Sequence, residues 1–238
     1  MRVLELWRYP VKSLQGEQVD AAEVGPHGLV GDRAYAIFDV ATGFGLTARR
    51  HPEMLFGAAR YRSDGSVRIT LPDGSVAADD EALSAWLGRA VQLRAVDQMV
   101  RERRYENPSD TESEAAESWN PFEWAGGSFH DSGRARVTVL SRASAGDWPV
   151  RRFRPNVVVD GSGEDALVGA RVRLGAAVLD VTKAVTRCVM ITRPQPGGIG
   201  TDRDVLRRLL REHDGTLSIG ATVAAPGVVR VGDELACT

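Results

Sequence analysis

The chain has 238 residues, a formal net charge of −2, 43% hydrophobic residues and 26% charged residues. These values are ordinary for a globular chain, and they exclude a collagen-like, low-complexity or wholly disordered protein. At roughly 150 residues per domain, the length predicts one or two domains. There is no overall basic field that would indicate a nucleic-acid-binding protein.

The sequence shows no sign of a membrane segment. No apolar run approaches the roughly 18–20 residues that a membrane helix needs. Charged residues at Arg2, Glu5 and Arg8 interrupt the apolar start, which therefore lacks the unbroken apolar segment of a secretory signal. We expect a cytoplasmic chain that does not associate with membranes.

Short strand patterns dominate the chain. Residues 3–7 form the first of them and end before Pro10, which cannot donate to a central ladder. Residues 67–71 alternate apolar and polar side chains with period two, as a half-buried strand does. Further strands are predicted at 18–24, 34–39, 55–61, 91–96, 136–140, 156–160, 171–182, 216–224 and 228–235. Many short strands separated by glycine-rich turns are typical of a barrel or a sandwich.

Two helices are predicted, at 80–88 and 202–212, because apolar residues recur there at helical spacing. The first follows an Asp79-Asp80 start. For the second we expect Thr201 as the N-cap, with Asp204 in the capping-box position three residues later.

The stretch 101–119 lacks periodicity and has an acidic, serine-rich middle, which indicates a solvated loop. We therefore divide the chain into a first β-rich unit at 1–95, a loop or linker at 96–124, and a second β-rich unit at 125–238. The predicted fold class is mostly β with a minor α component.

The sequence contains two cysteines, Cys188 and Cys237, which are too few for a disulfide framework or a four-thiolate metal cluster. Cys188 follows a strand pattern and allows two interpretations. It is either a small buried hydrophobe or a thiolate that binds a metal or carries sulfur, since a neighbouring cation such as Arg187 favours the anion. Cys237 stands beside the C-terminus, where chains usually fray, and we expect no role for it.

No phosphate-binding loop, dinucleotide fingerprint, nucleophile elbow or zinc-protease motif occurs in the chain. Of the 30 basic residues only Lys12 and Lys183 are lysines. Cations lie at three predicted strand ends, in segments 9–13, 31–33 and 152–156. Arginine forks and lysine charges bind phosphate or carboxylate. Each segment alone is compatible with a solvated surface charge, but together they predict an anion site if the fold brings them together.

These segments, taken in order, resemble the MOSC family, the domain named after the C-terminal part of molybdenum-cofactor sulfurase. The resemblance is to its longer form with an N-terminal β-barrel region, as in the amidoxime-reducing component and its bacterial relatives. It implies a MOSC β-barrel domain after an N-terminal β-rich subdomain. The segments that carry it are Tyr9-Pro10-Val11-Lys12-Ser13, Gly28-Leu29 with Asp32-Arg33, Leu46-Thr47-Ala48-Arg49, Phe129-His130-Asp131-Ser132, Phe153-Arg154-Pro155-Asn156, Arg187-Cys188 and the close at 226–233.

The resemblance implies a bound molybdenum cofactor, a pyranopterin with a terminal phosphate and a dithiolene that chelates the metal. Cys188 matches the family's molybdenum ligand, and a soft thiolate suits such a metal. Asp131 is implied with Cys188 as a catalytic residue. The positions implied to bind the cofactor are Lys12, Ser13, Arg33, Ser132, Arg154, Asn156, Thr186 and Arg187. Pyridoxal phosphate binding is also ascribed to the family, and no residue here is matched to it.

The implied activity is reduction of small N-hydroxylated compounds. The chain lacks the ferredoxin domain of some relatives, so we expect a separate electron donor of the flavin, haem or iron–sulfur type, and a monomeric enzyme. Residues 191–198 and a longer loop after Asp131 depart from the family pattern and leave the substrate open. Two alternatives remain: a sulfur carrier with a persulfide on Cys188, and a non-catalytic binding module.

Overall fold

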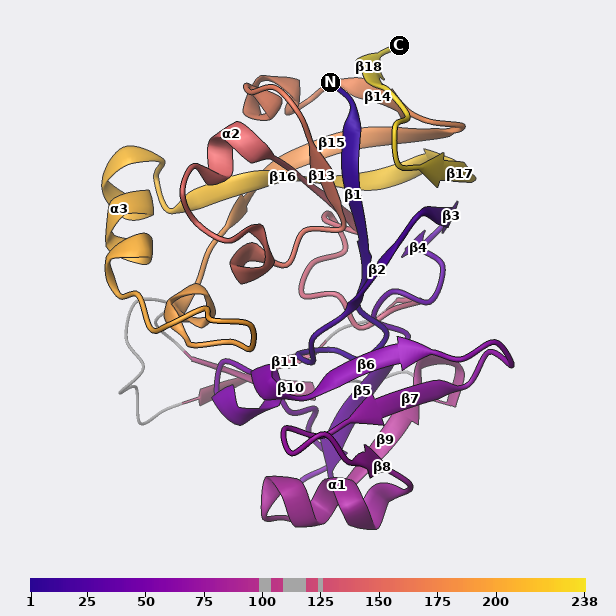
Figure 1. Ribbon diagram of the computed structural model, residues 1–238, viewed down its shortest axis with the longest axis vertical. Helices are drawn as coiled ribbons and strands as arrows, with labels where there is room; N and C mark the ends of the chain where they lie inside the picture. Colours follow the sequence, from indigo (N-terminus) through magenta and orange to yellow (C-terminus); the bar gives the residue numbers. More distant parts are fainter. Residues whose placement is uncertain (99–103, 109–118, 124–125) are drawn as a thin grey trace.

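The computed structural model describes residues 1–98, 104–108, 119–123 and 126–238. Figure 1 shows two lobes between which the chain crosses several times, with both termini at the same end. The predicted mostly-β class is confirmed. No helix in the described ranges has the length and apolar character needed to cross a membrane.

Eighteen strands and three α-helices make up the described structure. The strands are β1 (Val3–Arg8), β2 (Glu17–Val19), β3 (Ala21–Gly25), β4 (Gly28–Leu29), β5 (Tyr35–Asp39), β6 (Ala58–Tyr61), β7 (Val67–Thr70), β8 (Val76–Ala77), β9 (Val91–Ala95), β10 (Arg104–Pro108), β11 (Trp119–Glu123), β12 (Val137–Ser141), β13 (Val157–Val159), β14 (Arg171–Leu174), β15 (Ala177–Thr186), β16 (Thr216–Ala225), β17 (Gly227–Arg230) and β18 (Leu235–Cys237). The helices are α1 (Asp80–Leu87), α2 (Arg142–Ala145) and α3 (Asp204–Glu212). Short 3₁₀ helices lie at Pro52–Phe56, Val96–Gln98, Val150–Phe153, Glu164–Leu167 and Val189–Thr192.

The upper lobe in Figure 1 is built on a curled eight-stranded sheet with the order β18-β14-β15-β16-β12-β13-β1-β2. Only the β12–β13 pair is parallel among the described pairs of this sheet. The predicted strand 171–182 is two strands, because the chain turns back at Gly175 and β14 pairs with β15. The longest strands, β15 and β16, run side by side across the upper lobe.

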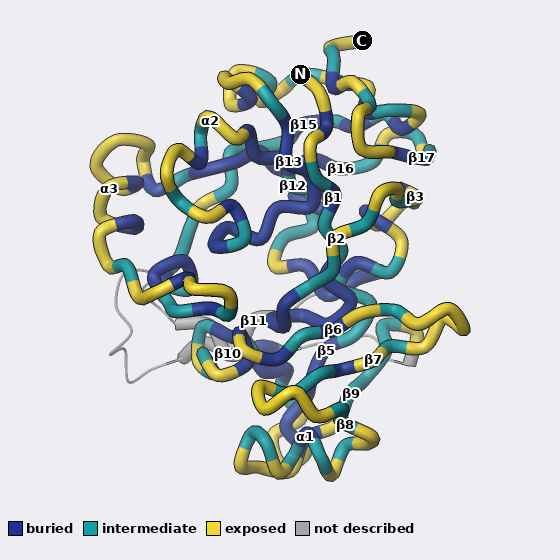
Figure 2. Tube along the Cα trace, viewed as in Figure 1, coloured by how far each residue is buried: buried dark blue, intermediate teal, exposed yellow. Residues whose placement is uncertain are grey.

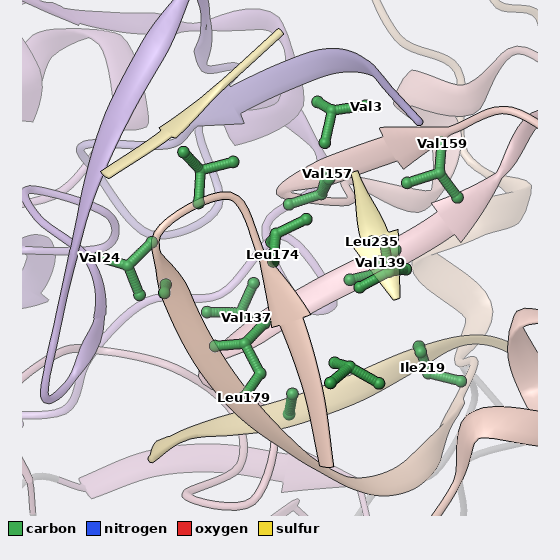
Figure 3. Close-up of a cluster of buried hydrophobic side chains, with 14 of the residues drawn as sticks. Val3, Val24, Val137, Val139, Val157, Val159, Leu174, Leu179, Ile219 and Leu235 are labelled. Carbon is green, nitrogen blue, oxygen red and sulfur yellow. The ribbon is translucent and has the colours of Figure 1, made fainter. Parts of the chain in front are cut away.

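Alternating side chains of the eight-stranded sheet face two different cores. Val139, Val157 and Val159 belong to the cluster drawn in Figure 3, together with residues of the small sheet β17-β3-β4. Leu140 and Val158, one position along the same strands, pack instead with α3 and the 3₁₀ helices. This alternation is expected because successive side chains of a strand point to opposite faces.

The lower lobe has its own core. Its walls are the sheets β6-β7-β8 and β5-β9 together with α1, which begins at the N-cap Asp79. Buried residues such as Ile37, Met54 and Leu83 fill the space between these walls, and Figure 2 shows the buried trace that runs through it. The two lobes therefore fold around separate cores.

The N-terminal part of the chain contributes strands to the upper lobe. β1 pairs with β13 and β2, and β3 pairs with β17 and β4, so the four strands within the first 29 residues lie in sheets of the upper lobe. The hydrophobic pattern of residues 3–7 predicted a buried strand, but such a pattern does not indicate which strand becomes its partner. The boundaries 1–95, 96–124 and 125–238 stay a prediction.

Three local expectations differ from the structure. Residues 104–108, predicted as part of a loop, form β10 and pair with β11; residues 109–118 of that predicted loop lie outside the described residues. The Asp202 carboxylate, not Thr201, accepts hydrogen bonds from the first backbone N–H groups of α3. A carboxylate two residues before the helix reaches these groups directly. Cys237 is exposed but paired in β18, so the terminus is not frayed there.

Candidate anion-binding site

The candidate site lies where three segments cross from one lobe to the other. The crossing after β1 carries Tyr9 and Lys12, the crossing before β5 carries Arg33, and the segment before β12 carries Phe129. Backbone hydrogen bonds tie the three together: Arg33 N donates to Tyr9 O at 2.7 Å, Lys12 N to Tyr35 O at 2.8 Å, and Phe129 N to Arg33 O at 2.8 Å. These hydrogen bonds join the three crossing segments into one layer, which we call the floor of the site.

A cavity of about 260 Å³ opens over this floor. All the sequence-predicted site residues except Asn156 line it, from the crossing segments and from the end of β15. The structure thus brings together side chains that lie up to 176 positions apart, from Lys12 to Cys188. Cys188 is half-buried in its wall, directly after β15 and before the 3₁₀ helix at Val189–Thr192.

The cavity is strongly cationic. Its lining includes Lys12, Arg33, Arg49, Arg154, Lys183 and Arg187, against one lining carboxylate, Asp131. Both lysines of the sequence are among these residues. Since like charges repel and their burial is costly, such a lining is suited to an anionic ligand.

Lys12 and Asp131 form an ion pair at the cavity wall. Lys12 Nζ donates to Asp131 Oδ1 and also to the Phe129 carbonyl at 3.1 Å. Burial lowers the pKa of Lys12, which is 6% exposed, and the Asp131 charge opposes that shift. Desolvation raises the pKa of Asp131, but the Lys12 ammonium outweighs it and holds that pKa well below its usual range. At neutral pH Asp131 is therefore an exposed carboxylate held against a charged lysine.

Arg33 and Arg154 lie over the same aromatic ring. Their guanidinium carbons are 4.8 Å and 4.4 Å from the ring centroid of Tyr9. Tyr9 is fixed by its hydroxyl, which donates to the Pro155 carbonyl at 3.2 Å, and burial raises its pKa to about 12. Arg33 also pairs with the buried Asp32. The ring thus holds two of the cations that line the cavity through cation–π contacts.

Backbone strain concentrates at this site. Among the residues the structure describes, five non-glycine residues have a positive φ, and Ser13, Arg33 and Arg154 are three of them. All three line the cavity. Left-handed backbone at such residues costs of order 1–3 kcal/mol each and persists where the surroundings enforce it, which is often at functional sites.

The side chains of two predicted cofactor-binding residues, Arg187 and Asn156, make hydrogen bonds within the protein. Arg187 donates to the Phe153 carbonyl at 2.9 Å and to the Leu217 carbonyl at 2.7 Å, so its side chain braces the cavity wall. Asn156 does not reach the cavity. It is fully buried, and its side chain accepts from Thr138 Oγ1 at 3.0 Å and donates to the Trp7 carbonyl at 3.3 Å. Its amide therefore links β12 to β1.

The remaining predicted residues lie at the rim and floor. Thr186 is exposed beside Cys188, and Ser132 follows Asp131, where its hydroxyl accepts from Arg134 N at 3.2 Å. Ser13 Oγ accepts from Ala48 N at 2.9 Å. Within the described ranges no three His, Cys, Asp or Glu side chains gather to hold a metal ion. Cys188 could thus offer one ligand to a metal whose other ligands come with a bound molecule.

Family models match almost the whole chain. The MOSC N-terminal beta barrel domain matches residues 1–119, and the MOSC domain matches residues 130–236. The chain belongs to the MOSC family. The match confirms the resemblance seen in the sequence, and it places the crossing segments after β1 and before β5 in the first domain and Asp131 and Cys188 in the second.

The MOSC chain is also similar to individual proteins. A molybdenum cofactor sulfurase of Drosophila grimshawi is 25% identical over 268 residues, covering 99% of this chain and 34% of that protein, so the chain spans about a third of its length. The YUAD protein of Bacillus subtilis is 14% identical, with 98% of this chain and 93% of that chain covered and a TM-score of 0.46. YiiM of Geobacillus stearothermophilus is 18% identical over 44% of this chain and 54% of that chain, with a TM-score of 0.35.

Among the residues of this MOSC site that were not predicted individually are Tyr9, Thr47 and His130. Thr47 Oγ1 and His130 Nε2 line the cavity, are buried, and have no hydrogen-bond partner. The family segments contain all three residues, but a buried polar atom without a partner is visible only in three dimensions. Burial and the nearby charges of Arg33 and Arg136 lower the pKa of His130 well below its usual value, so its imidazole is neutral.

This neutral histidine predicts a pH dependence of stability. His130 has a lowered pKa in the folded chain, so its contribution is present above the unfolded value of about 6.5 and is lost as the pH falls below it. We expect the free energy of unfolding to fall by up to about 1.4 kcal/mol per pH unit from this residue. Urea unfolding at pH 7.5, 6.5 and 5.5 measures this slope.

His130→Gln should flatten that slope, whereas His213→Gln, which removes an exposed histidine, serves as the control. Asp32 Oδ2, at 3.5 Å from His130 Nε2, and Asp131 favour protonation, while Arg33, Arg136 and Lys12 oppose it. An unchanged slope in His130→Gln would show that His130 takes up a proton equally in both states.

Proposed function

We propose that the chain binds a molybdenum cofactor in this cavity and reduces N-hydroxylated compounds with electrons from a separate redox protein. One observation carries the proposal: the half-buried thiol of Cys188 lines the same cavity as six cationic side chains. A soft sulfur donor beside a concentrated anion site suits a metal that arrives on an anionic carrier.

The residues present fit such a group. Arg154 Nη1 and Thr47 Oγ1 are buried polar atoms that line the cavity and have no hydrogen-bond partner. Leaving a buried donor unpaired costs about 1–3 kcal/mol, more for charged groups, and the oxygens of an anionic ligand would offer acceptors for these groups. Arg154 and Arg33 would hold the anionic part, and Cys188 would ligate the metal. When bound, the cofactor supplies the two-electron oxygen-transfer chemistry.

The reaction breaks an N–O bond, consumes two electrons and two protons, and releases water. Lys12 Nζ holds a proton at the cavity wall, and its lowered pKa makes it a better donor than a free lysine. Asp131 is ionised, so in this proposal it orients Lys12 and does not deliver the proton itself. Arg187 braces the segment that carries Cys188.

A separate electron donor is proposed because the two cysteines of the sequence are too few to bind a four-thiolate iron–sulfur cluster. The chain would receive two electrons per turnover from a flavin, haem or iron–sulfur protein. Reduced dyes can replace that donor in an assay, so the proposal can be tested before the donor is known.

The decisive experiment is metal and pterin analysis of protein purified from molybdate-supplemented cells, followed by reduction of an aryl amidoxime with a reduced dye. We expect molybdenum and pterin in equal amounts, near one per chain, and formation of the amidine. Protein without molybdenum or pterin that carries a persulfide mass on Cys188 would instead favour a sulfur carrier, the alternative to which the similarity to a sulfurase points. Protein that carries neither the cofactor nor a persulfide would overturn both the reductase and the sulfur-carrier proposals.

A further inference from the structure

We propose that Lys183 is a carboxylate-binding subsite that selects N-hydroxylated substrates bearing a negative charge. This inference rests on the proposed function and adds the substrate class to it. It concerns the lysine that lines the cavity on the same strand that leads to Cys188.

The backbone directs Lys183 into the cavity. The pairing of β15 with β16 shifts its register between Val181 and Lys183, and such a shift changes the direction of the side chains that follow. Lys183 and Val185 then both line the cavity, as alternate residues on one face of a strand should. The residue opposite Lys183 is Gly220, so no side chain across the strand pair supplies a counter-charge.

The other cations that line the cavity either have partners within the protein or fit the cofactor. Lys12 is paired with a carboxylate and a carbonyl, Arg33 with a carboxylate, and Arg187 with two carbonyls and a hydroxyl. Arg49 also has a partner. Arg154 is buried, and its unpaired Nη1 fits the anionic part of the cofactor.

Lys183 remains, half-buried and without an ion pair or hydrogen bond to its side chain among the described residues. Lys183 and Cys188 line the same cavity, so a substrate that reaches the Cys188 end can contact this charge. A lysine ammonium is a compact point charge on a flexible stem, which suits a carboxylate whose position varies between substrates. Partial burial weakens screening by salt and so strengthens the contact. The substrate class that fits is an N-hydroxylated compound with a carboxylate.

The test compares two aryl amidoximes, one neutral and one with a para carboxylate, in the wild type, Lys183→Met and Lys183→Arg. A hydrogen bond to a charged group contributes about 1.5–3 kcal/mol, so we expect Lys183→Met to lower the ratio of kcat/KM for the anionic over the neutral compound at least about tenfold. The change should lie in KM. Lys183→Arg should keep most of the ratio. Arg134→Met, which removes an exposed charge beside β15 but outside the cavity lining, should leave the ratio unchanged.

Two further measurements separate the possible failures. Pterin content of Lys183→Met should equal that of the wild type; loss of pterin would assign Lys183 to the cofactor and overturn the subsite. Equal effects on both amidoximes would overturn it as well. If the wild type reduces neither compound, the proposed function fails, and the subsite is then decided by calorimetric titration with benzoate. Binding that Lys183→Met abolishes supports the subsite, and binding that Lys183→Met leaves intact refutes it.

Discussion

Cys188→Ser is expected to give a folded protein that no longer reduces N-hydroxylated compounds. The exchange nearly preserves volume and removes the soft sulfur donor that a molybdenum centre needs. A buried structural cysteine would lose only packing, though a hydroxyl without a partner costs about 1–3 kcal/mol. Cys188 is half-buried, so this cost is small, and a stable fold does not distinguish the two roles.

Absorption of the thiolate-to-metal bond and amidoxime reduction do distinguish them. We expect both to vanish in Cys188→Ser, while some pterin remains because Arg33 and Arg154 still bind its anionic part. Cys237→Ser is the matched control, since that thiol is exposed in β18 outside the cavity lining. Reduction at the wild-type level in Cys188→Ser would remove the residue from the metal site. Loss of sulfur transfer from molybdenum-free protein would favour the sulfur carrier.

The strands of this fold could be predicted largely from local pattern. The strands predicted at 67–71 and 91–96 correspond to β7 and β9, and the helix predicted at 80–88 corresponds to α1. Pairing could not be predicted in the same way. That β1 joins β13, 149 or more positions away along the chain, depends on contacts between distant segments, which period-two patterning does not encode.

Most residues proposed for the site could be named from the sequence, but their arrangement in space could not be predicted from it. Lys12, Arg33 and Arg154 stand out in the sequence as cations at strand ends, and the family segments relate them to each other. Their convergence follows from the crossings between two lobes, which depend on contacts between segments far apart in the sequence. Asn156 differs from these residues. Its segment matches the family, but its side chain lies outside the cavity lining and forms hydrogen bonds with Thr138 and Trp7.

Arg154→Lys is expected to lower cofactor occupancy severalfold while the fold is retained. Burial lowers the pKa of Arg154 to about 10, so the residue is still charged at neutral pH, and lysine would keep that charge. What lysine loses is the planar fork, with its buried, unpaired Nη1 and the contact at 4.4 Å over the Tyr9 ring. A positive φ at this position adds strain that the ring contact helps to offset.

Pterin fluorescence per chain after denaturation measures this occupancy directly, without reliance on turnover. Arg208→Lys is the matched control, because its guanidinium carbon also lies over an aromatic ring, 5.1 Å from the centroid of Trp148, but outside the cavity lining. It should keep full occupancy. If Arg154→Lys also kept full occupancy, a positive charge at position 154 would be sufficient, and the arginine fork would have no part in holding the cofactor. An occupancy that falls only in Arg154→Lys would place the anionic group of the ligand against Nη1, over the ring that Tyr9 provides.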